Sequence, residues 1–299
     1  MDRFEALRTL VAAIDGGSLS AASRALRMPL PTVSRKISEL EVHLGARLLV
    51  RTSRKLELTE AGVAFAASAR RVLADLEEAE RTASGEYREP SGELLITAPL
   101  MFGRLHVLPI VLAFLAAQPR IGTRLMLSDD PIDLIDNHVD VAIRLGRLPD
   151  SALAAIKVGE VRWITCASPG YLARRGTPRT PEEIAGHDCL AFEWLAPSRT
   201  WHFAGGPGSG PVAIQPRFAA NTADALVAAA LSGLGIARMM SYQAADAVAT
   251  GALVTILDRY APEAIPVHLI HAQRGLTPLK LRAFLDFAGP RLKAVLGGI

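Results

Sequence analysis

Residues 18–59 have the sequence SLSAASRALRMPLPTVSRKISELEVHLGARLLVRTSRKLELT. Two helical patterns, one starting at Ser18 or Ser20 and the other at Pro31, flank the short turn 28–31, and a small basic hairpin follows. Serine is a favoured helix N-cap, and proline suits the start of a helix because its missing N–H has no partner there. A segment of this size and charge can enter a DNA groove and contact the backbone beside it.

The positive charge of the chain is concentrated in this segment. The 299 residues carry a formal net charge of only +3. Between Ser20 and Lys55, however, eight basic residues outnumber two acidic ones, which gives 8 − 2 = +6. The basic residues are Arg24, Arg27, Arg35, Lys36, Arg47, Arg51, Arg54 and Lys55, and the acidic ones are Glu39 and Glu41. A basic run by itself is as often a solvated surface, but its position on two adjoining helices favours binding to phosphates.

The second helix of the pair has one apolar side. Its apolar residues recur at helical spacing and are expected in the core: Val33, Ile37, Leu40 and Leu44. The opposite side, near the N-terminus of the helix, then faces base edges and phosphates. The candidate DNA-contacting residues on these two helices are Ser20, Leu30, Pro31, Thr32, Ser34, Arg35 and Lys36.

A wing follows these helices. Residues 48–50 and 56–58 predict two short strands joined by a turn over residues 51–55. The turn adds Arg51, Arg54 and Lys55 to the DNA-contacting candidates, with Arg54 or Lys55 able to enter a narrow minor groove.

Thr59, with Glu60 behind it, caps a further helix that continues to about Arg81. A helix of about 25 residues spans roughly 37 Å, and its apolar side needs a partner in water. We expect that partner to be a second copy of the chain.

Residues 1 to about 88 resemble the N-terminal domain of the LysR-type transcriptional regulators. The resemblance rests on FEALRTLVAAIDGGSLSAASRAL, VSRKISELEVHLGARLL and RTSRKLELTEAG, which occur in the family's order. It implies a winged helix-turn-helix domain at 1–58, a linker and dimerisation helix at 59–88 and an effector-binding regulatory domain at 91–299. The implied partners are a double-stranded, pseudo-palindromic DNA operator, a small-molecule effector, further copies in a homodimer or homotetramer, and RNA polymerase. The chain has Leu30 where the family commonly has a DNA-contacting glutamine.

Residues 91–299 alternate apolar runs of strand length with helical patterns, which favours an α/β fold with a predominantly parallel sheet. The expected strands are 94–98, 123–128, 139–145, 163–167, 190–194, 212–218, 235–239 and 266–271. The expected helices are 105–117, 169–174, 222–232, 241–249 and 277–292. By the same family resemblance, this region forms two lobes similar to a periplasmic binding protein. Lobe 1 would hold about 91–162 and 266–299, and lobe 2 about 163–265, with the effector in the cleft between them.

Ligands of open α/β sheets bind beyond the carboxyl ends of strands and beside helix N-termini. The strand over 94–98 ends just before a helix, so free N–H groups there are expected to bind an anionic or polar effector. Arg144 is the candidate partner of an effector carboxylate, although a structural ion pair with a carboxylate such as Asp129 is equally compatible. The candidate effector-binding residues are Thr97, Ala98, Pro99, Leu100, Met101, Phe102, Arg144, Ser168, Phe192, Asn221, Thr222 and Met239.

Other chemistries have weaker support. Cys166 and Cys189 leave a redox-responsive regulator as an alternative, but both lie in or beside strand patterns, where cysteine is usually a buried apolar residue. Residues 205–210 are rich in glycine but lack a following lysine, so they indicate a hairpin tip and not a phosphate loop. The histidines lack metal-ligand spacing, and no metal or other cofactor is expected.

An α/β enzyme with a DNA-binding arm is a further alternative, but the chain has no nucleophile elbow and no dinucleotide fingerprint. We therefore expect no enzymatic activity. No signal peptide and no apolar run of about 18 residues is evident, so we expect a cytoplasmic protein without a membrane partner.

Overall fold

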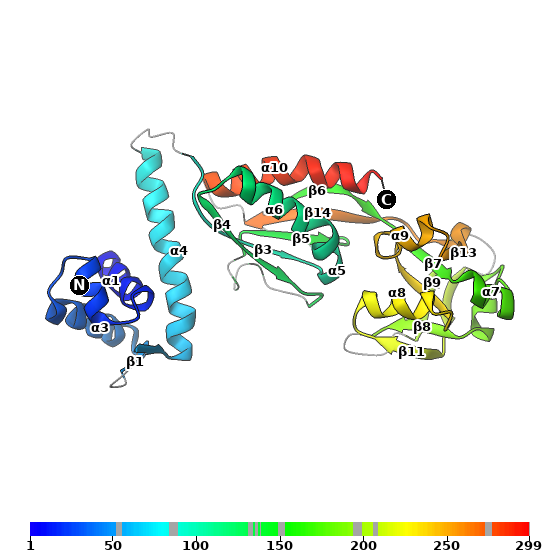
Figure 1. The fold of residues 1–299 in the computed structure, drawn as a ribbon, viewed down its shortest axis with the longest axis horizontal. Coiled ribbons are helices and arrows are strands. Elements are labelled where there is room, and N and C mark those ends of the chain that lie inside the picture. The colour runs from blue at the N-terminus through cyan, green and yellow to red at the C-terminus, as the bar shows by residue number, and fades with distance from the viewer. Residues whose placement is uncertain are drawn as a thin grey trace. The chain divides into compact units, whose positions relative to one another are not determined.

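The structure is a computed structural model. It describes residues 1–51, 56–83, 89–130, 134, 137, 139–148, 153–193, 199–205, 209–272 and 277–298. The chain divides into two compact units, Met1–Glu89 and Pro90–Ile299. In Figure 1 the first unit is drawn in blue and cyan, and the second in green to red.

The first unit has the element order of a winged helix-turn-helix domain with a long following helix. Its elements are α1 (Arg3–Asp15), α2 (Leu19–Ala25), α3 (Leu30–Leu44), β1 (Leu49–Arg51), β2 (Leu56–Leu58) and α4 (Glu60–Ala83). The strands are antiparallel, with Leu49 opposite Leu58. Two short strands are marginal alone, and these two lie against the helices.

Local signals set the helix ends of this unit. The Ser18 side chain caps α2 by accepting the Ala21 N–H at 3.1 Å. Helix α3 begins at Leu30, one residue earlier than expected, so Pro31 occupies its second position. Gly45 ends α3 with φ of 63°, a left-handed conformation that costs glycine no Cβ clash.

The core of the first unit joins helices α1, α2 and α3 to the start of the β1–β2 hairpin. Its buried residues are Ala6, Leu10, Ala13, Ala22, Val33, Ile37, Leu40, Leu48 and Leu49. Leu44, expected in this core, is exposed instead because it lies in the last turn of α3, beyond the packed helices. Helix α4 packs on α1, and its Ala66 and Ala69 are almost fully buried.

The start of α4 lies directly against the wing. The Thr59 hydroxyl donates to the Arg47 carbonyl at 2.7 Å and accepts the Gly62 N–H at 2.9 Å, so Thr59 caps α4 as expected. A Cβ added at Gly62 would lie only 2.0 Å from the Leu48 carbonyl oxygen. Only glycine permits this approach of the helix to the strand.

The second unit contains two five-stranded sheets. The first sheet has the order β4-β3-β5-β14-β6, in which β3 is parallel to β4 and β5, while β14 is antiparallel to β5 and β6. Its strands are β3 (Gly92–Ala98), β4 (Ile121–Leu127), β5 (Val141–Leu145), β6 (Leu153–Val161) and β14 (Ile265–Ala272). Its helical elements are α5 (Leu100–Phe102), the π-helical turn η1 (Gly103–Val107), α6 (Leu108–Ala117) and α10 (Leu279–Leu296).

Helices α6 and α10 cover one face of the first sheet (Figure 1). The rings of Phe114 and Phe284 meet edge to face there, with centroids 5.2 Å apart. The continuous helical segment Leu100–Ala117 is long and apolar enough to cross a membrane by length and composition, which differs from the sequence expectation. Phe102 and Phe114 are nonetheless fully buried, so its two phenylalanine side chains already have partners within the chain.

The second sheet has the order β11-β8-β12-β7-β13, in which β8 is parallel to β11 and β12, while β7 is antiparallel to β12 and β13. Its strands are β7 (Trp163–Ala167), β8 (Cys189–Phe192), β11 (Pro216–Ala220), β12 (Ile236–Met240) and β13 (Val254–Ile256). The hairpin of β9 (Thr200–Phe203) and β10 (Gly210–Ala213) is separate. The helical elements are α7 (Pro169–Arg175), η2 (Pro181–Gly186), α8 (Ala223–Leu231), η3 (Ser241–Gln243), α9 (Ala245–Ala249) and η4 (Asp258–Tyr260).

The expectation of a predominantly parallel sheet was wrong. Each sheet has two parallel and two antiparallel strand pairings, because β14 and β7 each run against their neighbours. The expected strand 212–218 is two strands, β10 and β11, and the expected helix 241–249 is split into η3 and α9. The sequence also missed β6, β9 and β13. The glycine-rich stretch joins β9 to β10, as expected of a hairpin.

Candidate functional site

The first candidate site is the surface of the helix-turn-helix. Of the predicted DNA-contacting residues on α2 and α3, Ser20, Leu30, Pro31 and Arg35 are exposed, and Thr32, Ser34 and Lys36 are half-buried. Arg35 has 66 % of its side chain exposed and pairs with Glu39 one turn later at 3.0 Å. An exposed pair of this kind is weak, so Arg35 remains available to a phosphate.

Lys36 differs from the expectation that it shares the outer face with Arg35. Its ammonium donates to the Glu5 carboxylate of α1 at 2.6 Å, and only 13 % of its side chain is exposed. One residue turns a helix by about 100°, which directs position 36 towards α1 when position 35 points outward. Lys36 therefore holds two helices together inside the first unit.

The wing begins from an anchored strand. The Glu41 carboxylate near the end of α3 accepts the N–H groups of Leu48 at 2.8 Å and Leu49 at 3.0 Å. This fixes the start of the hairpin relative to α3. The candidates Arg54 and Lys55, and the side chain of Arg51, lie outside the described residues.

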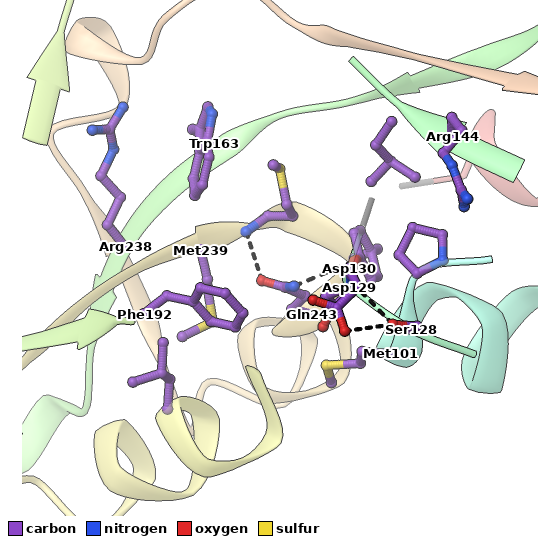
Figure 2. Close-up of a pocket in the computed structure, with 15 residues that line it drawn as sticks. Met101, Ser128, Asp129, Asp130, Arg144, Trp163, Phe192, Arg238, Met239 and Gln243 are labelled. Carbon is purple, nitrogen blue, oxygen red and sulfur yellow. Dashed lines mark hydrogen bonds between the residues drawn. The ribbon is translucent and has the colours of Figure 1, made fainter. Parts of the chain in front are cut away.

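The second candidate site is a cavity of about 310 Å³ in the second unit, where the two sheets meet. Figure 2 shows its lining side chains arising from both sheets and from η3. The lining residues are Pro99, Met101, Ser128, Asp129, Asp130, Arg144, Leu145, Trp163, Phe192, Leu226, Arg238, Met239, Met240, Tyr242 and Gln243.

Strand direction explains which residues reach the cavity. Strands β3, β4, β5, β8 and β12 all end there, which agrees with the position of ligands in open α/β sheets. Because β7 runs antiparallel to β12, its first residue, Trp163, reaches the cavity. Ser168 follows the opposite end of β7, where it caps α7 by accepting the Tyr171 N–H at 3.3 Å.

The predicted effector-binding residues divide into two groups. The cavity lining includes Pro99, Met101, Arg144, Phe192 and Met239, and does not include Thr97, Ala98, Leu100, Phe102, Ser168, Asn221 and Thr222. Thr97, Ala98 and Phe102 are fully buried in the second unit. The Phe102 ring packs edge to face on Tyr242, with centroids 5.2 Å apart, and so supports the cavity from behind.

The N-terminus of α5 is occupied by a carboxylate of the chain itself. The Leu100 N–H, which was expected to be free for an effector, donates to Asp129 at 3.0 Å. The alternative sequence expectation, an Arg144–Asp129 ion pair, is absent among the described residues. Asp129 therefore stabilises the helix start and leaves the Arg144 charge unbalanced.

Several lining residues were missed by the sequence reasoning. Asp129 and Asp130 follow the expected strand 123–128 directly, and this position alone could have identified them. Arg238 and Gln243 lie at the end of the expected strand 235–239 and at the start of the expected helix 241–249, so their position could also have identified them. Trp163 had no such signal, because the antiparallel direction of β7 was not anticipated.

Both cavity arginines lie in surroundings that disfavour their charge. Burial lowers the pKa of Arg238 to about 10, and its guanidinium lies over the Trp163 ring at 5.2 Å and the Phe203 ring at 5.0 Å. Burial also lowers the pKa of Arg144. Arg144 donates to the Ile143 carbonyl at 3.2 Å, while its Nη2 is buried without a hydrogen-bond partner in the described structure.

The two cysteines do not form a redox pair. Both are free and fully buried, and burial raises the pKa of each thiol to about 12. Strand β12 separates them, since Ala237 lies opposite Cys166 on one side and Ile236 opposite Cys189 on the other. Two strand spacings amount to about 9–10 Å, which exceeds the reach of a disulfide.

Within the described part of the chain, no three His, Cys, Asp or Glu side chains are grouped so that they could hold a metal ion.

Comparison with known proteins assigns both units to one family. Residues 4–63 match the model of the bacterial regulatory helix-turn-helix protein, lysR family, and residues 87–293 match the LysR substrate binding domain. The HTH-type transcriptional regulator CrgA of Neisseria meningitidis serogroup C (strain 8013) is 35 % identical over 285 residues, which cover 95 % of each chain.

Solved structures of LysR-type regulators agree with this family assignment. A structure of CrgA from Neisseria meningitidis matches with a TM-score of 0.62 and 34 % identity over 98 % of both chains. The full-length structure of AphB, a virulence activator of Vibrio cholerae, matches with a TM-score of 0.60 and 30 % identity, over 95 % of this chain and 97 % of that one. The expected fold class is thereby confirmed, and the enzyme alternative is excluded because the family is not enzymatic. The chain belongs to the LysR-type transcriptional regulators, DNA-binding proteins with an N-terminal helix-turn-helix and an effector-binding domain.

Proposed function

We propose that the chain works as a homodimer or homotetramer that binds a pseudo-palindromic operator and responds to a small-molecule effector held in the cavity. Residues 1–58 would bind DNA, 59–88 would join two copies, and 91–299 would bind the effector, with lobes at about 91–162 plus 266–299 and 163–265. The protein would act in the cytoplasm and contact RNA polymerase.

The observation that carries the DNA contact is the exposed N-terminal part of α3. Leu30, Pro31 and Arg35 are exposed there, while Val33 and Ile37 hold the other side of the helix in the core. A helix presented in this way fits a major groove. The remaining proposed contacts are Ser20, Thr32, Ser34, Lys36, Arg51, Arg54 and Lys55, among which Lys36 would act only through its bond to Glu5.

Helix α4 supports self-association. Helix α4 packs on α1 and buries Ala66 and Ala69, whereas Val63 and Val72 are exposed on the same helix. Exposed valines on a 24-residue helix favour a partner helix.

The cavity supports an effector site. It combines apolar walls with a few charged groups, which is the usual composition of a small-molecule site. We propose Pro99, Met101, Arg144, Phe192 and Met239 as its contacts. Thr97, Ala98, Leu100, Phe102, Ser168, Asn221 and Thr222 would act on the effector indirectly, through the residues that line the cavity.

The test is to map the DNA that the full chain binds across the genome and to measure affinity for a mapped site by fluorescence anisotropy. We expect two half-sites related by a two-fold axis, and a dimer or tetramer mass by light scattering. A monomer bound to a single half-site would contradict the proposal.

A further inference from the structure

The cavity of the second unit is lined by four charged side chains: Arg144, Arg238, Asp129 and Asp130. Among the described residues, none of these four forms an ion pair with another. Opposite charges that share a small cavity without pairing leave both signs available to a molecule between them.

The two arginines lack acidic partners in the part of the chain that the structure describes. The Arg238 guanidinium lies over the Trp163 ring and over the Phe203 ring, and these aromatic contacts do not neutralise its charge. Within the described residues, Arg144 donates only to the carbonyl of its neighbour Ile143, and its Nη2 is buried without a hydrogen-bond partner. A carboxylate would supply the charge-assisted hydrogen bonds that both lack.

The two aspartates have different local roles. Asp129 accepts the Leu100 N–H at 3.0 Å and is part of the α5 cap. The one side-chain hydrogen bond that Asp130 accepts from the described residues is long, at 3.4 Å from the Ser128 hydroxyl. Asp130 is therefore the better candidate to bind a cationic group of a ligand.

Figure 2 shows how the charges are distributed. Arg238, Trp163 and Arg144 lie along the upper side of the view, while Asp129 and Asp130 lie below them beside Ser128 and Gln243. The cavity thus has an arginine at each end of the view, with the two carboxylates between and below them. A molecule with one charge would match the side chains of one sign and meet the unpaired like charges of the other.

The walls and the volume limit the rest of the ligand. Phe192, Leu226 and Met239 provide an apolar wall. A volume of about 310 Å³ lies at the lower end of the range for ligand pockets, which indicates a small molecule.

We propose that the effector is a small dipolar molecule of the amino-acid class, with its carboxylate on Arg144 or Arg238, its ammonium on Asp130 and an apolar body along Phe192, Leu226 and Met239. This proposal depends on the proposed effector function of the cavity.

The test uses two sets of matched probes with the purified full chain. One set is L-phenylalanine, 3-phenylpropanoate and 2-phenylethylamine, and the other is L-leucine, 4-methylpentanoate and 3-methylbutylamine. Each set keeps the apolar body and removes one charge at a time. By calorimetry we expect at least one amino acid to bind about tenfold or more tightly than both of its analogues. If neither amino acid does so, including the case in which nothing binds, the proposal is wrong.

Variants then test which side chain binds the ammonium of the ligand and which binds its carboxylate. Asp130→Asn should weaken the amino acid about tenfold and leave the acid analogue unchanged. Arg144→Met or Arg238→Met should weaken the amino acid and leave the amine analogue unchanged. A purely structural role would weaken all three probes alike, and unchanged amino-acid binding in Asp130→Asn or in both arginine variants would overturn the assignment. Asp286→Asn and Arg282→Met, exposed positions on α10, are the matched controls.

The same preparations separate this proposal from the proposed function. If an amino acid binds but does not change affinity for the mapped operator, the ligand class stands and the effector function fails. If a neutral or singly charged metabolite alters operator binding through the cavity, the function stands and the dipolar class fails.

Discussion

The protein balances the charges of the α3 cations and of the cavity arginines in opposite ways. On α3, Arg35 is exposed and pairs with Glu39, and Lys36 is tied to Glu5. In the cavity, Arg144 and Arg238 are half-buried, and no ion pair neutralises them within the described residues. Exposed cations suit a polyanion that is bound through many weak, salt-sensitive contacts, whereas buried ones suit a single small ligand with fixed geometry.

The largest expected difference between exposed and buried groups concerns the thiols. The pKa of Cys166 and Cys189 is raised from 9.0 to about 12, so the thiolate fraction at pH 8 falls about a thousandfold. Iodoacetamide should label both thiols slowly in the native protein and rapidly in urea. Because the folded pKa is the higher one, the protonated thiols stabilise the fold fully below pH 9, and this contribution is lost as the pH rises through 12. Rapid native labelling of either cysteine would restore the redox alternative.

Gly62→Ala should impair the first unit and leave the second unit unaffected. The new Cβ would lie 2.0 Å from the Leu48 carbonyl oxygen, and overpacking of this kind costs about 1–3 kcal/mol. We expect weaker DNA binding and a lower unfolding temperature for the first unit, with ligand binding in the cavity unchanged. Calorimetric unfolding and operator anisotropy check this, and loss of ligand binding would show that the two units are coupled.

Arg35→Ala and Lys36→Met should have different effects, because Arg35 is proposed to contact a DNA phosphate and Lys36 to hold α3 against α1. Removing the exposed Arg35 should lower the salt slope of operator binding by about 0.9. Lys36→Met should leave the slope unchanged and reduce stability by about 1 kcal/mol, because it leaves Glu5 without its partner. Operator anisotropy across a salt series distinguishes the two, with Arg282→Ala on α10 as control; equal slopes for Arg35→Ala and wild type would remove Arg35 from the interface.

The smallest effect is expected at the surface ion pair between Arg104 of η1 and Asp224 of α8. Both side chains are about half exposed, and exposed pairs contribute about 0.2–1 kcal/mol. Arg104→Met should therefore change the unfolding free energy by less than about 1 kcal/mol and leave ligand affinity within about threefold. A larger loss of affinity would mean that this contact between η1 and α8 controls ligand binding in the cavity.

Much of the first unit could be predicted because its signals are local. Ser18, Thr59 and Gly45 cap helices within a few residues of themselves, and Val33, Ile37 and Leu40 mark the buried side of α3 by spacing alone. The role of Lys36 could not be predicted, since its partner Glu5 is 31 positions away in the chain.

The cavity shows the limit of the same reasoning. Pro99, Met101, Arg144, Phe192 and Met239 lie at or near the ends of expected strands, and all line the cavity. Ser168 follows the carboxyl end of the expected strand 163–167, but β7 is antiparallel to β12, so Trp163 at its other end lines the cavity instead.

The amino-acid sequence by itself determined the winged helix-turn-helix, the long helix after it, the α/β character of the second unit and the family, because caps, helical spacing and strand-length apolar runs act over short distances. Only the tertiary structure decided the direction of β7 and β14, the internal pairing of Lys36 and the set of unpaired charges around the cavity. These three features depend on which segments, distant in the sequence, pack together. Such packing overrides local propensity, so no pattern within a short stretch of sequence could predict them.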